Sequence, residues 1–114
     1  MRKIKTLKKN YEFKNVINKG NFFVGRQIIV YIQKNNKNEN YLGIAVSTKV
    51  GKAVTRNRLK RLIRENYIIK KDSINKGYNI VFIWNKKVDP DTANFHIINE
   101  DMCNILKKAG LIEE

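Results

Sequence analysis

The sequence has few of the residues that build metal, disulfide and nucleophilic sites. Its 114 residues include one cysteine, Cys103, and one histidine, His96. A single cysteine forms neither an internal disulfide nor a cysteine-rich zinc site, and the apolar residues around Cys103 predict a buried thiol in a reducing compartment. His96 has no recognisable cysteine, serine or carboxylate partner to orient it for catalysis, so we interpret it as an ordinary helix residue.

Long apolar runs and nucleotide-binding glycine motifs are also missing. No stretch approaches the roughly 18 consecutive apolar residues of a membrane-spanning helix, and the charged N-terminal segment has no apolar run of the kind found in secretory signals. The six glycines form neither a Walker-type loop nor a dinucleotide-binding pattern. We therefore expect a cytoplasmic protein that has no membrane partner and does not hydrolyse a substrate by itself.

Acidic residues are scarce in the first part of the chain. Residues 1–71 contain 19 lysines and arginines but only three acids, whereas residues 72–114 contain five lysines and seven acids, and the net charge is +14. Apolar residues make up 42% of the chain, which argues against a disordered polycation and suits one folded domain. Charge concentrated in this way indicates a polyanionic partner, either nucleic acid or an anionic membrane surface.

The hydrophobic pattern predicts an α/β fold in which a small mixed sheet packs with helices. The expected order is helix, strand, strand, helix, strand, helix, with segments at about 10–20, 22–33, 41–48, 56–70, 78–85 and 91–109. An extra strand arises if the second segment breaks near Gly25. The polar loop 34–40 predicts a hairpin between the first two strands, and the strand at 78–85, apolar on both faces, should be central. Pro90 should open the last helix.

A strongly basic segment, KVGKAVTRNRLKRLIRE, occupies residues 49–65 and contains no acid before Glu65. On a helix, Arg56, Lys60 and Arg64 form one row. Asn57 and Arg61 stand beside this row, Leu59, Leu62 and Ile63 fall on a different face, and Lys49 and Lys52 precede the helix. Like charges at this spacing destabilise an isolated helix by about 0.2–0.5 kcal/mol per pair, so the row indicates a bound polyanion. Because the apolar stripe has only the width of a core contact, nucleic acid is favoured over a membrane.

A second set of residues could form a separate site. Tyr31 falls on the strand face opposite to Ile28, Val30 and Ile32, and Phe13 and Ile17 share one face of the first helix. If that helix packs across the sheet, Phe13, Ile17 and Tyr31 could line a groove for unstacked single-stranded bases. The periodicity fits equally well with Phe13 and Ile17 as plain core residues.

The basic segment closely resembles the signature of the bacterial ribonuclease P protein component, often called the RNR motif after its Arg-Asn-Arg centre. The matching positions are Lys49, Gly51, Ala53, Arg56, Asn57, Arg58, Lys60, Arg61 and Arg64. The likeness extends upstream through LKKNYEFKNVINKG at 7–20, Arg26, Tyr31 and the segment LGIAVSTKVG. It is strong over about residues 7–70, and the last third matches only in its pattern.

The resemblance implies a fold and a function. The fold would be an α/β sandwich, a single RNA-binding domain over residues 1–114, whose strand–helix–strand crossover around the motif is left-handed; the general rule alone predicts a right-handed one. The function would be that of the protein subunit of an RNA-based endonuclease that removes the 5′ leader from precursor tRNA. The RNA would perform the hydrolysis with Mg²⁺ held mainly by RNA and substrate, and no protein side chain would be catalytic.

The resemblance also assigns residues to the two partners, the catalytic RNA and the precursor tRNA. With Lys52 added from the charge pattern, the expected contacts to the catalytic RNA are Lys49, Lys52, Arg56, Asn57, Arg58, Lys60, Arg61 and Arg64. The expected leader-binding cleft contains Phe13, Ile17 and Tyr31, with Ile17 where the family commonly has an aromatic residue. One alternative is a general RNA-binding or ribosome-associated protein without processing activity. Another is a stand-alone nuclease, and the missing acid–base cluster argues against it.

Overall fold

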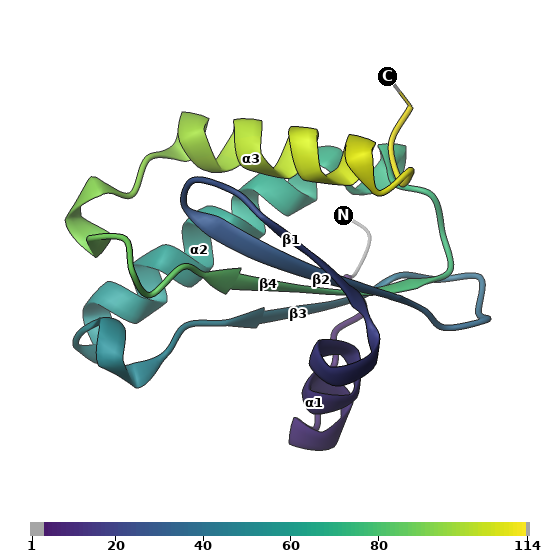
Figure 1. Cartoon of the computed structure of the whole chain (residues 1–114), viewed down its shortest axis with the longest axis horizontal. Helices are drawn as coiled ribbons and strands as arrows, with labels where there is room; N and C mark the ends of the chain where they lie inside the picture. Colours follow the sequence, from purple (N-terminus) through teal and green to yellow (C-terminus); the bar gives the residue numbers. More distant parts are fainter. Residues whose placement is uncertain (1–3, 114) are drawn as a thin grey trace.

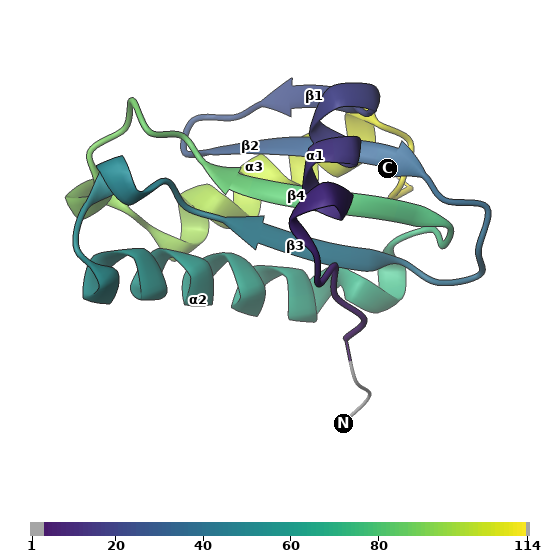
Figure 2. The same cartoon turned by 90° about the horizontal axis from the view of Figure 1, so that it is seen from below.

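The computed structural model describes residues 4–113 and shows a four-stranded mixed sheet with helices on both faces (Figures 1 and 2). The elements are α1 (Asn10–Lys19), β1 (Asn21–Val24), β2 (Ile28–Lys34), β3 (Tyr41–Ala45), α2 (Ala53–Lys70), β4 (Tyr78–Trp84) and α3 (Phe95–Lys108). Short 3₁₀ turns lie at Thr48–Val50, Lys71–Ser73 and Pro90–Thr92. The strand order is β1-β2-β4-β3; the β1–β2 and β2–β4 pairs are antiparallel and the β3–β4 pair is parallel. The predicted α/β class with a mixed sheet is confirmed.

The hairpin predicted across loop 34–40 is wrong, because β4 lies between β2 and β3. Val81 of β4 is paired with Tyr31 of β2 on one side and with Gly43 of β3 on the other. A strand that is apolar on both faces is best stabilised between two neighbours, so the predicted central position of β4 is confirmed. The hairpin instead joins β1 and β2, because the segment at 22–33 breaks at Gly25 into two strands.

The crossover from β3 through α2 to β4 is left-handed, against the general rule for such units. Seen from the α1 side, β3 and β4 both run to the left, β4 lies above β3, and α2 lies on the far face (Figure 2). Packing agrees, because Val81 clusters with Val16 of α1 while the next residue, Phe82, makes an edge contact with Tyr67 of α2. Consecutive strand residues point to opposite faces. The handedness implied by the family resemblance is therefore confirmed.

The two faces of the sheet are buried to different extents. The larger apolar cluster lies between the sheet and the pair α2 and α3, and it includes Ile28, Val30, Leu59, Ile63, Ile80, Phe82, Trp84, Ile98, Met102 and Leu106. The cluster under α1 has only Leu7, Val16 and Val81 as buried members. Because α1 is a ten-residue helix, it covers only part of its face (Figure 2), and the rest of that face is open.

Two helix boundaries and one burial prediction differ from expectation. α2 begins at Ala53 rather than at Thr55 or Arg56. α3 begins at Phe95, because Asp89 caps the separate turn that starts at Pro90, and the Asn94 side chain caps the helix itself. Cys103 is half-buried rather than buried, since it follows Met102 on the flank of the apolar stripe. No helix in the described part of the chain is long and apolar enough to cross a membrane.

Candidate nucleic-acid interface

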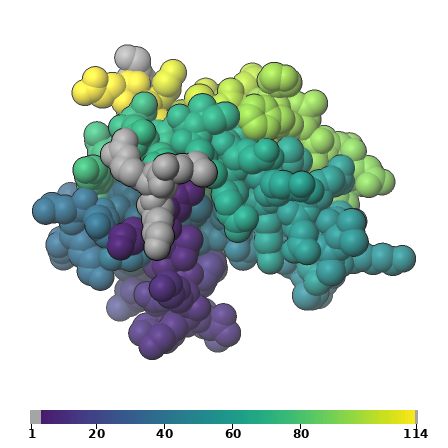
Figure 3. Space-filling model, turned by 180° about the vertical axis from the view of Figure 1, so that it is seen from behind, coloured from purple at the N-terminus to yellow at the C-terminus, as the bar shows by residue number. Residues whose placement is uncertain are grey.

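The basic side chains of α2 and of the segment before it, together with Asn57, are called the basic face. Its members are Lys49, Lys52, Arg56, Asn57, Arg58, Lys60, Arg61 and Arg64. All of them are exposed except Arg56 and Lys60, which are half-buried. Figure 3 shows α2 as a teal band across the back of the molecule, with α1 below it and α3 above it. The inner face of the same helix buries Leu59 and Ile63 completely, so the predicted division of this helix into two faces is confirmed.

Two arginines of the basic face also hold the local structure together. Arg56 Nη1 donates a hydrogen bond to the Gly51 carbonyl oxygen at 2.6 Å and closes the turn that leads into α2. Arg58 Nη2 donates to the Pro90 carbonyl oxygen at 3.1 Å and ties α2 to the turn before α3. A guanidinium has five N–H donors, so both residues keep donors for a second partner. Sequence periodicity does not predict these structural roles.

The basic face has few competing carboxylates. Among residues 4–113, the ion pairs that the structure shows are made by Arg26 and Lys71, and none involves the basic face. The one acid within α2 is Glu65, which is exposed. Arg61 and Arg64 are therefore open to solvent, and arginines without acidic partners favour bidentate contacts to phosphate.

Arg64 connects the basic face with the α1 side of the sheet. A hollow of about 230 Å³ opens at the outer edge of β3 and is lined by Thr6, Leu7, Phe13, Leu42, Ile44 and Arg64. The segment before α1 borders it, because the N–H of Leu7 donates to the Leu42 carbonyl oxygen at 2.9 Å. The structure thus places a phosphate-binding type of side chain and an aromatic ring, Phe13, in the wall of one hollow.

The three residues expected in the cleft lie on the α1 side of the sheet, but they are not equivalent. Phe13 rests on Gly43, where an added Cβ would stand 2.7 Å from Phe13 Cε2. Phe13 and Tyr31 pack against the cluster of Leu7, Val16 and Val81. Ile17 is half-buried one turn further along α1 and is not among the side chains packed on that cluster. The structure brings Phe13 and Tyr31 to one cluster and leaves Ile17 beside it.

Two side chains with shifted pKa values lie on the inner side of α2, away from the basic face. Burial lowers the pKa of Lys70, whose ammonium donates a hydrogen bond to Asn99 Oδ1 on α3. Burial also raises the pKa of the Tyr67 hydroxyl. Among residues 4–113, no group of three or more His, Cys, Asp or Glu side chains is placed to hold a metal ion.

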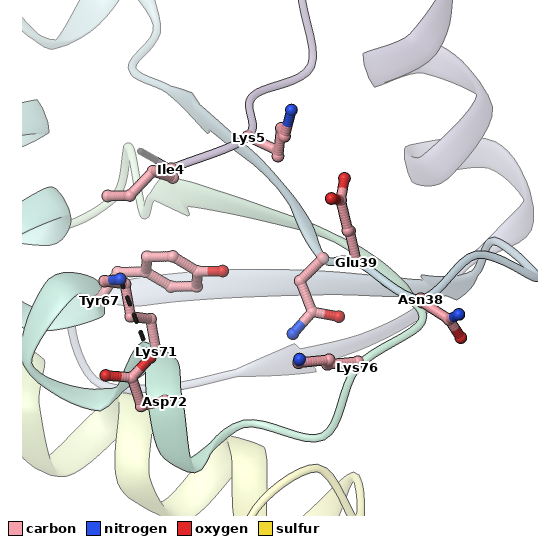
Figure 4. A pocket seen from close by; sticks show the side chains of 9 residues that line it. Ile4, Lys5, Asn38, Glu39, Tyr67, Lys71, Asp72 and Lys76 are labelled. Atoms are coloured by element: carbon pink, nitrogen blue, oxygen red, sulfur yellow. Dashed lines mark ion pairs between the residues drawn. The ribbon is translucent and has the colours of Figure 1, made fainter. Parts of the chain in front are cut away.

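A second hollow lies at the C-terminal end of α2 (Figure 4). It has a volume of about 200 Å³, and its charged lining residues are Lys5, Glu39, Lys71, Asp72 and Lys76. Lys71 Nζ lies 3.9 Å from Asp72 Oδ1. Because cations and carboxylates are mixed here, this hollow does not share the single-sign charge of the basic face, and we assign it no part in the nucleic-acid interface.

Comparison with known proteins agrees with this arrangement. The chain matches the family model for ribonuclease P over residues 1–110. It is 44% identical over 106 residues to the ribonuclease P protein component of Clostridium botulinum (strain Loch Maree / Type A3), covering 92% of this chain and 94% of that protein. The protein component of Clostridioides difficile (strain 630) is 41% identical over 108 residues, covering 94% and 93%.

Solved structures give the same result at the level of the fold. The RNase P protein of Staphylococcus aureus superposes with a TM-score of 0.82 at 34% identity, covering 97% of this chain and 100% of that chain. The RNase P protein from Thermotoga maritima gives a TM-score of 0.81 at 33% identity, covering 91% and 96%. The chain belongs to the ribonuclease P protein family.

Proposed function

We propose that this chain, a tRNA-processing subunit by its family, binds the catalytic RNA of a ribonucleoprotein endonuclease and helps it to remove the 5′ leader from precursor tRNA. The whole chain acts as one RNA-binding domain in the cytoplasm, and the RNA performs the hydrolysis. The observation that carries the proposal is the division of the molecule into two surfaces, the basic face of α2 and the open sheet face beside α1.

The basic face suits a folded RNA. Arg61, Arg64, Lys49 and Lys52 are exposed, and each can neutralise a phosphate and release its counterion. Arginine adds two parallel hydrogen bonds to a phosphate where the geometry allows. The proposed contacts are those of the whole basic face, with Arg56 and Arg58 using the donors that the Gly51 and Pro90 carbonyl oxygens leave free.

The open sheet face suits a single strand. The four described strands contain no acidic residue, so the strand side chains present no carboxylate to a leader. Phe13 and Tyr31 would supply rings for stacking, and Ile17 an apolar contact without a ring. The hollow at the edge of β3 links this face to Arg64, so that one RNA-bound protein could contact catalytic RNA and leader together.

Mg²⁺ would be held mainly by the RNA and the substrate. The carboxylates of Glu12, Asp89 and Asp101 each accept hydrogen bonds from backbone N–H groups, which gives them structural tasks. The protein would lower the Mg²⁺ requirement by neutralising phosphates that otherwise repel one another. Its own side chains bind and position RNA, and we assign them no step of the hydrolysis.

The test is cleavage of precursor tRNA by the cognate catalytic RNA at limiting Mg²⁺, with and without the protein. The protein should lower the Mg²⁺ concentration needed for half-maximal cleavage. The double variant Arg61→Ala/Arg64→Ala should lose most of this effect, whereas Lys107→Ala/Lys108→Ala, which removes the same charge from the exposed end of α3, should keep it. Equal cleavage with and without wild-type protein would overturn the proposal.

A second measurement separates the alternatives. In the presence of the catalytic RNA, a processing subunit binds precursor tRNA more tightly than mature tRNA. Equal affinity for the two would favour a general RNA-binding protein. Cleavage by the protein and Mg²⁺ without the RNA would favour a stand-alone nuclease.

A further inference from the structure

Two apolar side chains of β1 stand exposed on the sheet face that α1 covers in part. Phe22 is 62% exposed and Val24 is 61% exposed. β1 pairs antiparallel with β2 and places Phe22 opposite Tyr31 and Val24 opposite Ile29. Directly opposite residues in such a pair share a face. Phe22 therefore lies on the same face as Tyr31, which packs on the cluster under α1.

The rings of Phe22 and Tyr31 contact each other, and Phe22 is the more exposed of the two. Their centroids lie 5.8 Å apart and their planes are tilted by 32°. Tyr31 is half-buried, whereas most of the Phe22 ring faces solvent. A cross-strand aromatic pair already stabilises a hairpin, but that role does not require so much open ring surface. The exposed ring is available to a flat partner.

The surroundings of the pair favour a polyanion with flat apolar groups. Among residues 4–113 no strand residue is acidic, and the Glu12 carboxylate of α1 accepts hydrogen bonds from the N–H groups of Lys8 and Lys9. Lys19, the last residue of α1 and three positions before Phe22, is exposed. Rings beside cations suit single-stranded RNA, because its bases stack while its phosphates pair with lysine. A second copy of this chain, with its net charge of +14, would be repelled.

Phe22 also lies on the strand that directly follows α1. α1 ends at Lys19 and β1 begins at Asn21, so Phe22 follows the last residue of the helix by three positions along the chain. Ile17, in the last turns of α1, offers no ring at this end. The Phe22–Tyr31 pair is thus the aromatic surface at the β1 side, and Phe13 is the ring at the β3 side.

We propose that Phe22 stacks on a base of the 5′ leader and extends the leader-binding surface from α1 onto β1. This inference rests on the proposed function. It assigns to Phe22 a positioning and affinity role that acts only through the leader. The Tyr31 ring packs against the Phe22 ring, and Lys19 at the end of α1 pairs with a leader phosphate.

The test compares the affinity of the reconstituted holoenzyme for precursor tRNA with its affinity for mature tRNA, which lacks the leader. Phe22→Ala should reduce the ratio of these affinities by about tenfold, the size expected for losing one base–ring stack. Phe22→Leu should reduce it nearly as much, because an apolar side chain without a ring cannot stack. Phe22→Tyr should retain it. The matched control is Tyr11→Ala, which removes a ring of similar exposure, 66%, from the first turn of α1, at the opposite end of the helix from β1.

A fluorescent adenine analogue placed at successive leader positions gives a direct readout. In wild-type holoenzyme its emission should be quenched at one position, and Phe22→Ala should relieve that quenching. Unchanged affinity ratios in Phe22→Ala and Phe22→Leu, with Tyr31→Ala still reducing the ratio, would overturn the role of Phe22 and leave the proposed function standing. A wild-type protein without any leader-dependent affinity would instead count against the leader-binding part of the proposed function.

Sedimentation of the free protein addresses the competing use of this edge strand. The proposal expects the same monomeric mass for wild type and Phe22→Ala. A wild-type dimer that Phe22→Ala converts to a monomer, with no change in the affinity ratio, would show that β1 is a self-association surface and would overturn the proposal.

Discussion

The side chain of Asp101 on α3 accepts a hydrogen bond from the backbone N–H of Gln27 at 2.7 Å. The same carboxylate also accepts from the N–H groups of Arg26 at 3.0 Å and Ile28 at 3.3 Å. One buried carboxylate therefore accepts three backbone hydrogen bonds from the turn between β1 and β2. At Gly25 an added Cβ would lie 2.6 Å from Asp101 Cγ, so glycine permits this close approach. The contact determines where β1, and with it Phe22, lies on the sheet.

Replacing Asp101 with alanine should destabilise the protein by about 2–3 kcal/mol, because buried N–H donors of the turn lose their acceptor. Urea unfolding followed by circular dichroism measures this change. Glu100→Ala is the matched control, since its exposed carboxylate only pairs with Arg26 at 3.3 Å and such pairs contribute about 0–1 kcal/mol. Equal losses in the two variants would mean that the turn does not depend on Asp101.

Replacing Arg64 with alanine should weaken binding to the catalytic RNA and flatten its salt dependence. The plot of log affinity against log salt concentration has a negative slope, and its magnitude should decrease by about 0.7–0.9, the value for one neutralised phosphate. Lys107→Ala, on α3, should leave the slope unchanged. A slope that is the same in wild type and Arg64→Ala would show that Arg64 does not contact phosphate.

Arg56→Ala offers a contrast within the same row. Its guanidinium donates to the Gly51 carbonyl oxygen, so this variant should lose thermal stability by about 0.5–1.5 kcal/mol in addition to RNA affinity. Arg64→Ala should lose affinity with little change in stability. Thermal unfolding of the two free proteins separates the effects, and equal melting temperatures would contradict a structural role for Arg56.

The periodicity of the chain was enough to predict the faces of α2 and the central position of β4. Both follow from local patterns, since the inner face of α2 repeats Leu59 and Ile63 at helical spacing and β4 is apolar at successive positions. The partners of β4 could not be predicted in this way. Pairing between distant segments depends on how the whole sheet packs, and loop 34–40 suggested a hairpin that the insertion of β4 prevents.

In the candidate site, too, features within one helix could be predicted from the sequence and features that depend on distant segments could not. The basic face was predicted from the row of Arg56, Lys60 and Arg64, because a single helix contains it. Phe22 was missed, since its exposure follows from the register of β1 against β2, which becomes visible only when the segment at 22–33 is broken at Gly25. The hydrogen bond from Arg58 to the Pro90 carbonyl oxygen joins residues too far apart in the sequence for any spacing rule.

Adding a methyl group at Gly43 should move the Phe13 ring, because a Cβ there would lie 2.7 Å from Phe13 Cε2. We expect Gly43→Ala to cost about 1–3 kcal/mol of stability through overpacking and to reduce the preference for precursor over mature tRNA. The double variant Gly43→Ala/Phe13→Leu should recover stability, since the smaller side chain makes room, but should not recover the preference. Additive losses in the double variant would show that the two residues are not coupled.

The stability of the protein should depend on pH through Glu12 at the start of α1. Glu12 Oε1 accepts hydrogen bonds from the N–H groups of Lys9 and Lys8, both at 2.9 Å, and these bonds lower the pKa of the carboxyl below its ordinary value of 4.5. Because the folded-state pKa is the lower one, the stabilisation is complete above the unfolded-state pKa and is lost as the pH falls through the folded-state pKa.

Glu12→Gln should therefore be less stable than wild type near neutral pH and should approach wild type in acid, where the wild-type carboxyl is protonated. Urea unfolding in steps from about pH 7 down to about pH 2 measures how this difference changes. Glu65→Gln, which removes an exposed charge from α2, controls for the general effect of net charge. A difference between Glu12→Gln and wild type that stays constant over this range would show that the ionised carboxylate does not stabilise the start of α1.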